Sequence, residues 1–372
     1  MRSTILAALS LTLALGACGG EEPPPQPPPP PPPPPPAETA STPPPADTTP
    51  PPPTKPALVE LMHDNTKAMG EAFNAHDAAK MAALVTDDVA VFDYGTGETH
   101  TKGDFQSGMT QLFQWFSDAK SHANRIWIKG NVEISEITWV GTMTGDVMGM
   151  KATNKPVGQM RVHVTWFNDD GLVKEIHEYG DGAGLMAQMQ GKKTAPPVPT
   201  LPTNPPEVHL ATGDAAQDKL VDFAKANDDA FNKDDVKPVM EMTADDADVW
   251  INFGGPAMKG KKELTAGIKD WFKTFPDQKW TTVNAWGIDG FGIIEHTMNG
   301  TQKGALGPLR ASGKPVTNWH WVDIIQQSAD GKLQHDWGYA NLVEVMAQTG
   351  AMKHGGEKPA GGPAPKPMPK KK

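Results

Sequence analysis

Residues 159–190 read QMRVHVTWFNDDGLVKEIHEYGDGAGLMAQMQ. Two runs in which apolar and polar residues alternate are separated by NDDG, a cluster of residues typical of a tight turn. The runs predict two consecutive strands, and the closing piece from Gly184 to Gln190 predicts a short helix. The stretch therefore predicts a sheet whose last strand leads directly into a helix.

The end of this stretch occurs twice in the chain. YGDGAGLMAQ at 179–188 aligns without a gap to YANLVEVMAQ at 339–348. The tyrosine and the closing Met-Ala-Gln match, whereas Asp181 of the first copy is replaced by Asn341 in the second. A carboxylate has thus become an amide at one position of an otherwise similar segment.

Further landmarks recur in the same order ahead of both copies. They include AFNAHD (72–77) with AFNKDD (230–235), TDDVAVF (86–92) with ADDADVW (244–250), and KPV at 155–157 with KPV at 314–316. The separation drifts only from 157 to 160 positions, so few insertions are needed. Two copies are too few for a solenoid, which needs about three units to bury a core. We therefore expect two domains of one fold at 57–191 and 207–350, joined by a linker at 192–206.

Within each copy the helical patterns come first and the strand patterns follow. In the first copy, apolar residues at helical spacing predict a helix from Leu58 to Phe73, and Asp77 is placed to cap a second helix through Leu84. A third helix is expected near Met109 to Phe116, followed by consecutive strands. Helices followed by a run of strands predict an α+β fold, with the helices on one face of a curved antiparallel sheet.

The first 18 residues have the features of a targeting segment. Arg2 is followed by an apolar run that is too short to span a bilayer, and the run ends in LGAC. This ending resembles the lipobox of bacterial lipoproteins, which implies cleavage before Cys18 and lipidation of its thiol. Gly19 at the next position implies sorting to the outer membrane. The alternative is an ordinary signal peptide followed by a free cysteine.

Two further segments are too biased in composition to form a core. Residues 19–56 are mostly proline, which favours an extended spacer, although a proline-rich ligand for a partner is the alternative. Residues 351–372 are rich in glycine, proline and lysine and predict a disordered basic tail. The chain would thus be held away from the membrane by the spacer and anchored only through lipid on Cys18.

The order of KPV, a strand, DG, a strand and GLMAQ resembles the SnoaL-like polyketide cyclases of the nuclear transport factor 2-like superfamily. The resemblance covers both copies and implies two cone-shaped domains, each a curved sheet whose helices enclose a pocket. Members of the superfamily often pair through their sheets, so the two domains are expected to form an intrachain pseudo-dimer. The cyclases need no metal and no cofactor.

The resemblance also implies an Asp at the end of the last strand that acts as general acid and base on a carbonyl compound. The family strand often carries a Trp four residues before that Asp. Here the second copy has Trp337 and Asn341, whereas the first has His177 and Asp181. Neither copy keeps both residues, so the Trp and Asp pattern of the family is incomplete in each copy.

Alternation along the last strand places His177, Tyr179 and Asp181 on one face. If that face lines the cone, burial raises the pKa of Asp181 and suits it to proton transfer, which an amide cannot perform. We therefore expect Asp181 to be catalytic and Asn341 to bind ligand, together with His177, Tyr179 and Trp337. The alternative is a solvated Asp181 beside a turn.

Two pairs of residues in the earlier strands are further candidates. Glu136 and Glu295 match between the copies, and each is a lone charge on an otherwise apolar or small face. His163 and His320 lie on matching strands, and His163 could exchange a proton with a carboxylate. We expect Glu136 and His163 to assist catalysis and Glu295 and His320 to bind ligand. The alternatives are edge or solvent-facing carboxylates and histidines that are merely hydrogen-bonded.

Composition excludes several classes of function. The sequence contains no HExxH motif and only one cysteine, which argues against a metal site. The formal net charge of −10 and the lack of a phosphate-binding loop argue against nucleic-acid binding. The 11 tryptophans and 18 methionines can furnish an apolar pocket for a small hydrophobic molecule.

These observations lead to one main hypothesis and one alternative. The chain is expected to be an outer-membrane lipoprotein that binds a small apolar carbonyl compound, with cyclase- or isomerase-type acid and base chemistry in the first domain. The alternative is a non-catalytic lipoprotein that binds a ligand or a protein partner.

Overall fold

The computed structural model describes residues 57–94 and 97–352. The predictions for Cys18, for the spacer at 19–56 and for the tail beyond 352 lie outside the described residues. Among the described helices, none is long and apolar enough to cross a membrane.

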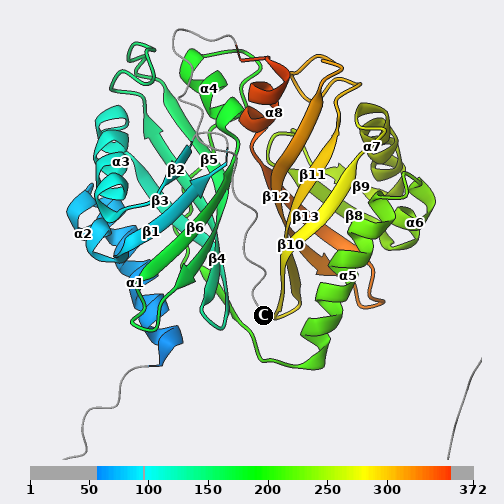
Figure 1. Cartoon of the computed structure of the whole chain (residues 1–372), viewed down its shortest axis with the longest axis horizontal. Helices are drawn as coiled ribbons and strands as arrows, with labels where there is room; N and C mark the ends of the chain where they lie inside the picture. The colour runs from blue at the N-terminus through cyan, green and yellow to red at the C-terminus, as the bar shows by residue number, and fades with distance from the viewer. Residues whose placement is uncertain (1–56, 95–96, 353–372) are drawn as a thin grey trace, which may run out of the picture. The chain divides into compact units, whose positions relative to one another are not determined.

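The first domain begins with helices and continues with strands, as its sequence predicts (Figure 1). Its elements are α1 (Leu58–Asn74), α2 (Ala78–Ala83), β1 (Val85–Asp93), β2 (Gly97–Thr99), α3 (Lys102–Trp115), β3 (Lys120–Lys129), β4 (Val132–Thr142), β5 (Pro156–Phe167), β6 (Val173–Gly180) and α4 (Gly182–Gln190).

The second domain repeats this order after one short strand. That strand is β7 (Glu207–Leu210), and the elements of the second domain are α5 (Ala215–Phe231), α6 (Val236–Glu241), β8 (Thr243–Ile251), β9 (Met258–Lys259), α7 (Gly260–Thr274), β10 (Lys279–Ile288), β11 (Phe291–Thr301), β12 (Pro315–Gln327), β13 (Leu333–Ala340) and α8 (Leu342–Thr349).

The two sheets have equivalent strand orders. The first is β2-β1-β6-β5-β4-β3-β7, and the second, read from its other edge, is β9-β8-β13-β12-β11-β10. The predicted α+β class is confirmed, but the sheets are mixed, because β1 pairs parallel with β6 and β8 pairs parallel with β13. β7 follows the predicted linker and adds to the first sheet, parallel to β3.

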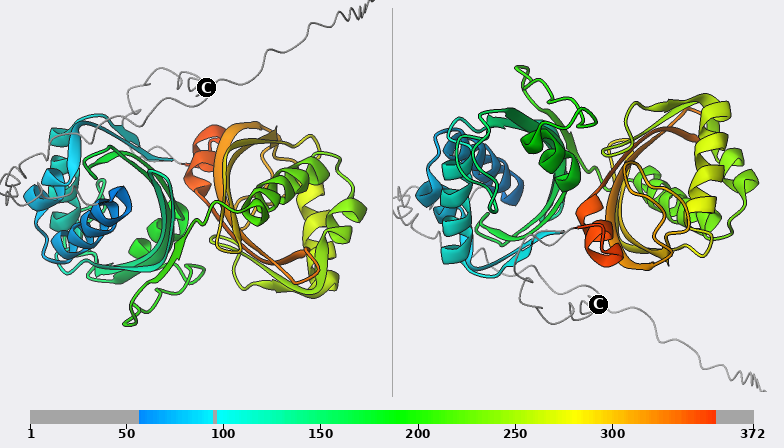
Figure 2. Two further views of the ribbon diagram at one scale, coloured as in Figure 1. Left: turned by 90° about the horizontal axis from the view of Figure 1, so that it is seen from below. Right: turned by 90° about the horizontal axis from the view of Figure 1, so that it is seen from above.

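Each sheet curves around its own helices. Figure 2 shows α1 lying within the curve of the first sheet and α5 within the curve of the second. The helices therefore cover the concave face and leave the convex face to other contacts. In the first domain, Met62 of α1 packs with Ile126 and Ile176 of the sheet in the core between helices and sheet.

The convex faces are apolar as well. One cluster of buried side chains combines Trp127, Val162 and Val164 of the first sheet with Ile293 and Val322 of the second. Strands that are buried on both faces show little difference in hydrophobicity between the faces. This property limits what alternation in the sequence can reveal about the pocket.

Equivalent turns and caps are made by equivalent residues. Asp118 Oδ1 accepts the Thr142 amide at 2.6 Å, and Asp277 Oδ1 accepts the Thr301 amide at the same distance. Asp77 caps α2 as expected, with its carboxylate 2.9 Å from the Lys80 amide. Such short polar residues satisfy backbone donors that a helix end or a bend leaves open.

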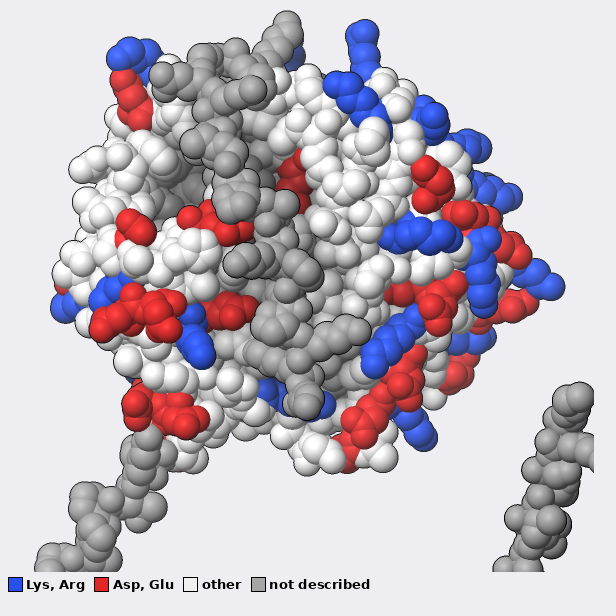
Figure 3. Space-filling view, in the orientation of Figure 1, with Lys and Arg blue, Asp and Glu red and all other residues white. Residues whose placement is uncertain are grey.

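The outer helices of the second domain carry a mixed charged surface. Figure 3 shows basic and acidic side chains interleaved over the side that bears α6 and α7. There Lys261 lies 2.7 Å from Asp245, and Lys273 lies 2.8 Å from Asp270. Interleaved charges of both signs are typical of a solvated face and do not form a basic patch.

Candidate functional site

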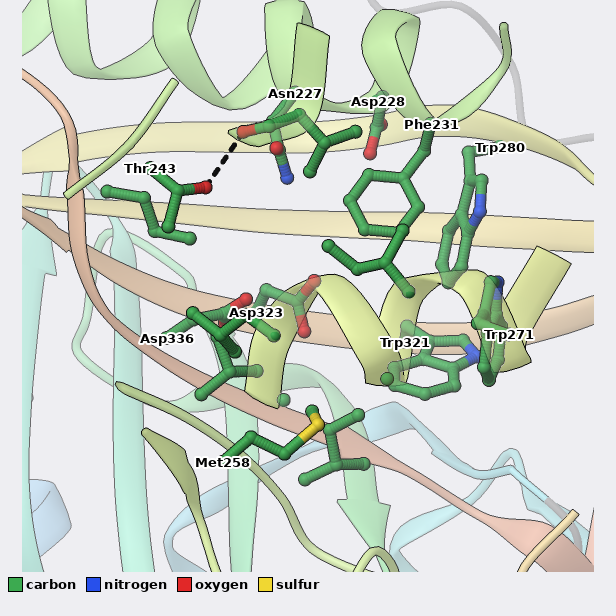
Figure 4. A pocket seen from close by; sticks show the side chains of 18 of the residues that line it. Asn227, Asp228, Phe231, Thr243, Met258, Trp271, Trp280, Trp321, Asp323 and Asp336 are labelled. Atoms are coloured by element: carbon green, nitrogen blue, oxygen red, sulfur yellow. Dashed lines mark hydrogen bonds between the residues drawn. The ribbon is translucent and has the colours of Figure 1, made fainter. Parts of the chain in front are cut away.

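A cavity of about 160 Å³ lies inside the cone of the second domain, between its helices and the concave face of its sheet (Figure 4). Engineered cavities of about 150 Å³ hold a single aromatic ring, so the space suits a small molecule. The lining is mostly apolar, and the residues used below are Asp228, Phe231, Trp271, Trp280, His296, Trp321, Asp323 and Asp336.

One end of the cavity is aromatic. The ring centroids of Trp271, Trp280 and Trp321 lie between 5.4 and 6.0 Å from one another. The indole nitrogens of Trp271 and Trp280 both donate to the side-chain oxygen of the buried Gln278. This shared acceptor fixes the two rings, and Figure 4 shows all three tryptophans grouped at one end. The arrangement can hold an apolar ring by stacking and edge contacts.

The other end is a chain of ionisable groups centred on His296. Its Nδ1 lies 2.8 Å from Asp228 Oδ1, from α5, and its Nε2 lies 3.1 Å from Asp323 Oδ2, from β12. The second contact is an ion pair without hydrogen-bond geometry. Burial opposes the charge on His296, but the two carboxylates outweigh it and raise its pKa to about 10. His296 is therefore an imidazolium at neutral pH and serves as the counter-ion of this end.

Asp336 of β13 completes the polar end and differs from the other two aspartates. Its Oδ1 is buried and has no hydrogen-bond partner among the described residues. Burial, and then the negative charge of Asp323, raise the pKa of Asp336 well above its usual value. Burial therefore favours the protonated form of Asp336, and in that form it can donate a hydrogen bond to a ligand oxygen.

The concave face of the first domain carries a different set of polar residues. Glu133 is buried and accepts hydrogen bonds from Ser135 at 2.5 Å and from Thr66 at 2.8 Å. Burial raises the pKa of Glu133 to about 7, although these hydrogen bonds lower it. The carboxyl group can therefore gain or lose a proton near neutral pH.

His163, a predicted catalytic residue, lies on the same concave face. Its Nε2 is 3.3 Å from Glu178 Oε1, and Arg161 also contacts Glu178, at 2.8 Å. Burial and the neighbouring positive charge of Arg161 hold the pKa of His163 well below its usual value. His163 is therefore neutral, in contrast to His296 of the second domain.

Asp181 and Asn341 occupy equivalent positions at the start of the last helix of each domain. Asp181 Oδ1 accepts the Gly184 amide at 2.9 Å and caps α4. Asn341 Oδ1 accepts the Val343 amide at 3.0 Å and caps α8. Burial raises the pKa of Asp181 to about 6, despite its backbone hydrogen bonds. Asp and Asn are equally good caps, so the exchange of carboxylate for amide retains the cap in both domains.

The expectation that the face of His177 and Tyr179 lines the pocket is wrong. Tyr179 donates to Glu295 Oε1 at 2.7 Å, and His177 Nδ1 lies 2.7 Å from the same oxygen. Both side chains thus project from the convex face of β6 and contact β11 of the other domain. The prediction that His177 and Tyr179 share one face of the strand is correct. The sequence could not tell which face the helices cover, because both faces are buried.

The remaining predicted residues lie on the same convex side. Tyr339 donates to Glu136, Trp337 packs over Arg125, and His320 stacks on Tyr94 with ring centroids 3.8 Å apart. His320 Nδ1 also lies 2.7 Å from Glu344. Glu136, Glu295, His177, Tyr179, His320 and Trp337 thus lie together, but in contacts between the two sheets and outside the cavity of the second domain.

The sequence did not single out the aspartates and histidine that gather in the cavity. Asp228, His296, Asp323 and Asp336 come from four separate elements. The usable signal was the pairing of strands: His296 opposes Trp321, so it shares a face with Asp323 two residues further along β12. Among the described residues, no group of three or more His, Cys, Asp and Glu side chains is arranged to hold a metal ion.

Comparison with known proteins identifies related sequences in both halves. Residues 63–189 match the family described as SnoaL-like polyketide cyclase, and residues 224–335 match the family described as SnoaL-like domain. A search of the curated proteins gave no significant match.

Solved structures similar to this chain cover about one domain each. A protein of a Jannaschia species, assigned as a SnoaL-like polyketide cyclase, is 13% identical over 39% of this chain and 99% of its own, with a TM-score of 0.34. IdmH from Streptomyces antibioticus, assigned as a polyketide cyclase, is 23% identical over 34% and 97%, with a TM-score of 0.31. A protein with a ketosteroid isomerase-like fold from Catenulispora acidiphila is 11% identical over 34% and 92%, with a TM-score of 0.30.

Proposed function

Because the chain carries two tandem SnoaL-like domains, we propose that the second domain binds a small, mostly apolar carbonyl compound and moves a proton on it. This moves the catalytic role expected for Asp181, His163 and Glu136 of the first domain to the cavity of the second.

The observation that carries the proposal is the unpaired Oδ1 of Asp336 at the polar end of an aromatic cavity. An unsatisfied buried polar atom is costly and is uncommon unless a ligand or water meets it. A carboxyl whose protonated form is favoured by burial is a donor suited to a carbonyl oxygen, which becomes more negative as an enolate forms. The tryptophans at the opposite end would hold the apolar part of the same molecule.

The proposed step is transfer of a proton from the carbon next to the carbonyl. Asp323 takes this proton as its carboxylate, while the electron pair of the C–H bond moves into the enolate. Asp336 donates a hydrogen bond to the enolate oxygen, and His296 balances the charge of Asp228 and Asp323. Return of the proton to the same or another atom gives exchange or isomerisation. Attack by the enolate carbon on a second carbonyl gives ring closure, with the proton of Asp323 passing to the alkoxide oxygen that forms.

The test uses 1-indanone and 1-tetralone, which are small ketones with exchangeable hydrogens beside the carbonyl. Binding is followed by quenching of tryptophan fluorescence, and exchange of those hydrogens in D₂O is followed by NMR. Asp336→Asn should bind either ketone almost as well, because its size is kept. Exchange should fall by about 10²- to 10⁴-fold, the range typical for a lost acid or base.

Asp181→Asn is the matched control in the first domain. It should leave exchange unchanged, whereas a fall equal to that of Asp336→Asn would return the chemistry to the first domain. Quenching by the ketones without exchange in the wild type would favour the non-catalytic ligand-binding alternative. Neither quenching nor exchange with ketones of this size would refute the proposed ligand class.

We also propose that Cys18 carries lipid and anchors the protein in the outer membrane, on the support of the LGAC ending and Gly19. Cys18→Ser should move the protein to the soluble fraction and leave the signal segment uncleaved by the lipoprotein peptidase. A mutant that stays in the outer-membrane fraction would refute lipid anchoring.

The contacts between convex faces support a third proposal, that the two domains pair within one chain as a pseudo-dimer. Support comes from the apolar cluster shared by the two sheets and from reciprocal hydrogen bonds of Tyr179 and Tyr339. Small-angle scattering of the full-length chain should fit one compact body for the two domains. A profile of two independently moving bodies would contradict it.

A further inference from the structure

Two buried carboxylates occupy equivalent positions on the convex faces of the two sheets. Glu136 of β4 is 2% exposed and Glu295 of β11 is 1% exposed. Each accepts a hydrogen bond from a tyrosine of the opposite domain, Tyr339 for Glu136 and Tyr179 for Glu295. The tyrosines are equivalent to each other, so the hydroxyl contacts follow a twofold pattern.

The positive charges do not follow this pattern. Arg125 binds Glu136 of its own sheet with two hydrogen bonds, Nε to Oε2 at 2.8 Å and Nη2 to Oε1 at 2.7 Å. The equivalent residue of the second sheet is Asn284, which donates to Glu295 Oε2 at 2.6 Å and brings no charge. Glu295 thus lacks a cation from its own domain.

The second cation comes from across the contact. His177 of the first domain places Nδ1 2.7 Å from Glu295 Oε1. Its equivalent in the second domain is Trp337, whose ring lies 4.2 Å from the Arg125 guanidinium. Burial disfavours charge on His177, but Glu295 and Glu175 outweigh it and raise its pKa to about 9. Glu175 is only partly buried, with its side chain 29% exposed. Each buried glutamate therefore has one cation, and both cations belong to the first domain.

Pairing of like domains would upset this balance. Two copies of the first domain would give each Glu136 both Arg125 and the other copy's His177. Two copies of the second would give each Glu295 only Asn284 and Trp337, leaving a buried carboxylate with no cation. An unpaired buried charge is strongly unfavourable, and so is an excess of like charge.

We infer that residues 125, 177, 284 and 337 make the convex face of each domain selective for the unlike domain, and against a second copy of itself. The inference rests on the proposed pairing of the two domains. It identifies the partner of each sheet as the other half of the same chain, and it explains why a duplicated interface has not stayed symmetric.

Moving one cation tests the inference. In the variant Arg125→Asn/Asn284→Arg the unlike pair has no cation at Glu136 and two at Glu295. Both like pairs then have one cation for each carboxylate. Analytical ultracentrifugation of the full-length chain in detergent should show one chain per particle for the wild type and at least two for the variant. Lys261→Asn, which removes an exposed cation 2.7 Å from Asp245, should behave as the wild type.

A second comparison decides the matter if the exchanged variant does not fold. Arg125→Asn alone should lower the melting temperature more than Arg125→Asn/Glu136→Gln, because the double variant leaves no unpaired charge. A purely steric role for Arg125 would make the double variant as unstable as the single one or worse. A folded, single-chain exchanged variant with the wild-type melting temperature would overturn the inference. Wild-type scattering from two separate bodies would instead overturn the pairing itself.

Discussion

At the position where β11 of the second domain carries His296 between two aspartates, β4 of the first domain carries Ile137. The aspartates at the polar end of the cavity are matched in the first domain by Gly70, His163 and Ile176. The landmarks that reveal the repeat thus belong to turns, caps and the strand that follows α2 or α6, whereas the polar and aromatic residues around the cavity have diverged. The shared sequence specifies the fold, and the differences specify which cone holds an acidic, aromatic cavity.

The largest expected effect comes from making the second interior resemble the first. His296→Ile removes the imidazolium from between Asp228 and Asp323 and leaves two buried carboxylates without their cation. Breaking a buried ion pair in this way costs about 3–5 kcal/mol. Urea unfolding followed by circular dichroism should show a loss of this size at pH 7.

The triple variant with Asp228→Asn and Asp323→Asn added is the control for this first prediction, and it should regain a large part of the loss. A loss below about 1 kcal/mol in the single variant would mean that the cluster is solvated. The two interiors would then differ much less than the structure indicates.

The second expected effect is a pH dependence of stability. It differs between the two interiors, because the first buries a carboxyl group that becomes negative and the second buries a histidine that is positive. In the first domain, burial raises the pKa of Glu133 from 4.5 to about 7. Its folded form binds a proton more tightly than its unfolded form, so stability is full below pH 4.5 and falls as pH rises toward 7. Glu133→Gln should remove this fall and stabilise the protein by roughly 1–3 kcal/mol at pH 8.

In the second domain the pKa of His296 is raised from 6.5 to about 10. The contribution of protonated His296 to stability is complete below pH 6.5 and is lost as the pH rises toward 10. This loss occurs at higher pH than the loss caused by Glu133. Unfolding curves from pH 4 to 10 for wild type and Glu133→Gln therefore test the assignment. An unchanged slope between pH 4.5 and 7 in the variant would remove Glu133 as its cause.

The sequence predicted the elements well because each depends on local signals. Asp77 caps a helix and NDDG turns the chain whatever the rest of the molecule does. The parallel pairing of β1 with β6 depends on contacts between distant segments, and no local signal reports it.

The site could not be predicted for a related reason. Asp336 and Trp337 are neighbours on one strand and point to opposite faces, and both faces are apolar and covered. Trp337 and the lone Glu295 drew attention to the convex face, where they serve the contact between domains. Only the position of the helices shows that Asp336 faces the cavity.

The smallest expected effects concern the caps at Asp181 and Asn341, which differ in their second contacts. Asp181→Asn keeps the cap of α4 and removes a carboxyl whose pKa burial raises from 3.8 to about 6, so stability at pH 7, where that carboxyl is charged, should rise by roughly 1–2 kcal/mol. Asn341 also uses its Nδ2 to donate to the Tyr94 carbonyl at 2.5 Å. In Asn341→Asp a carboxylate would face that carbonyl with no hydrogen to donate, at a cost of about 1–3 kcal/mol. Urea unfolding of both variants at pH 7 measures the difference, with Asn341→Ala as the reference for losing the cap. Equal stability of the two exchanges would show that cap chemistry alone decides these positions and that the amide of Asn341 is not required at the contact between domains.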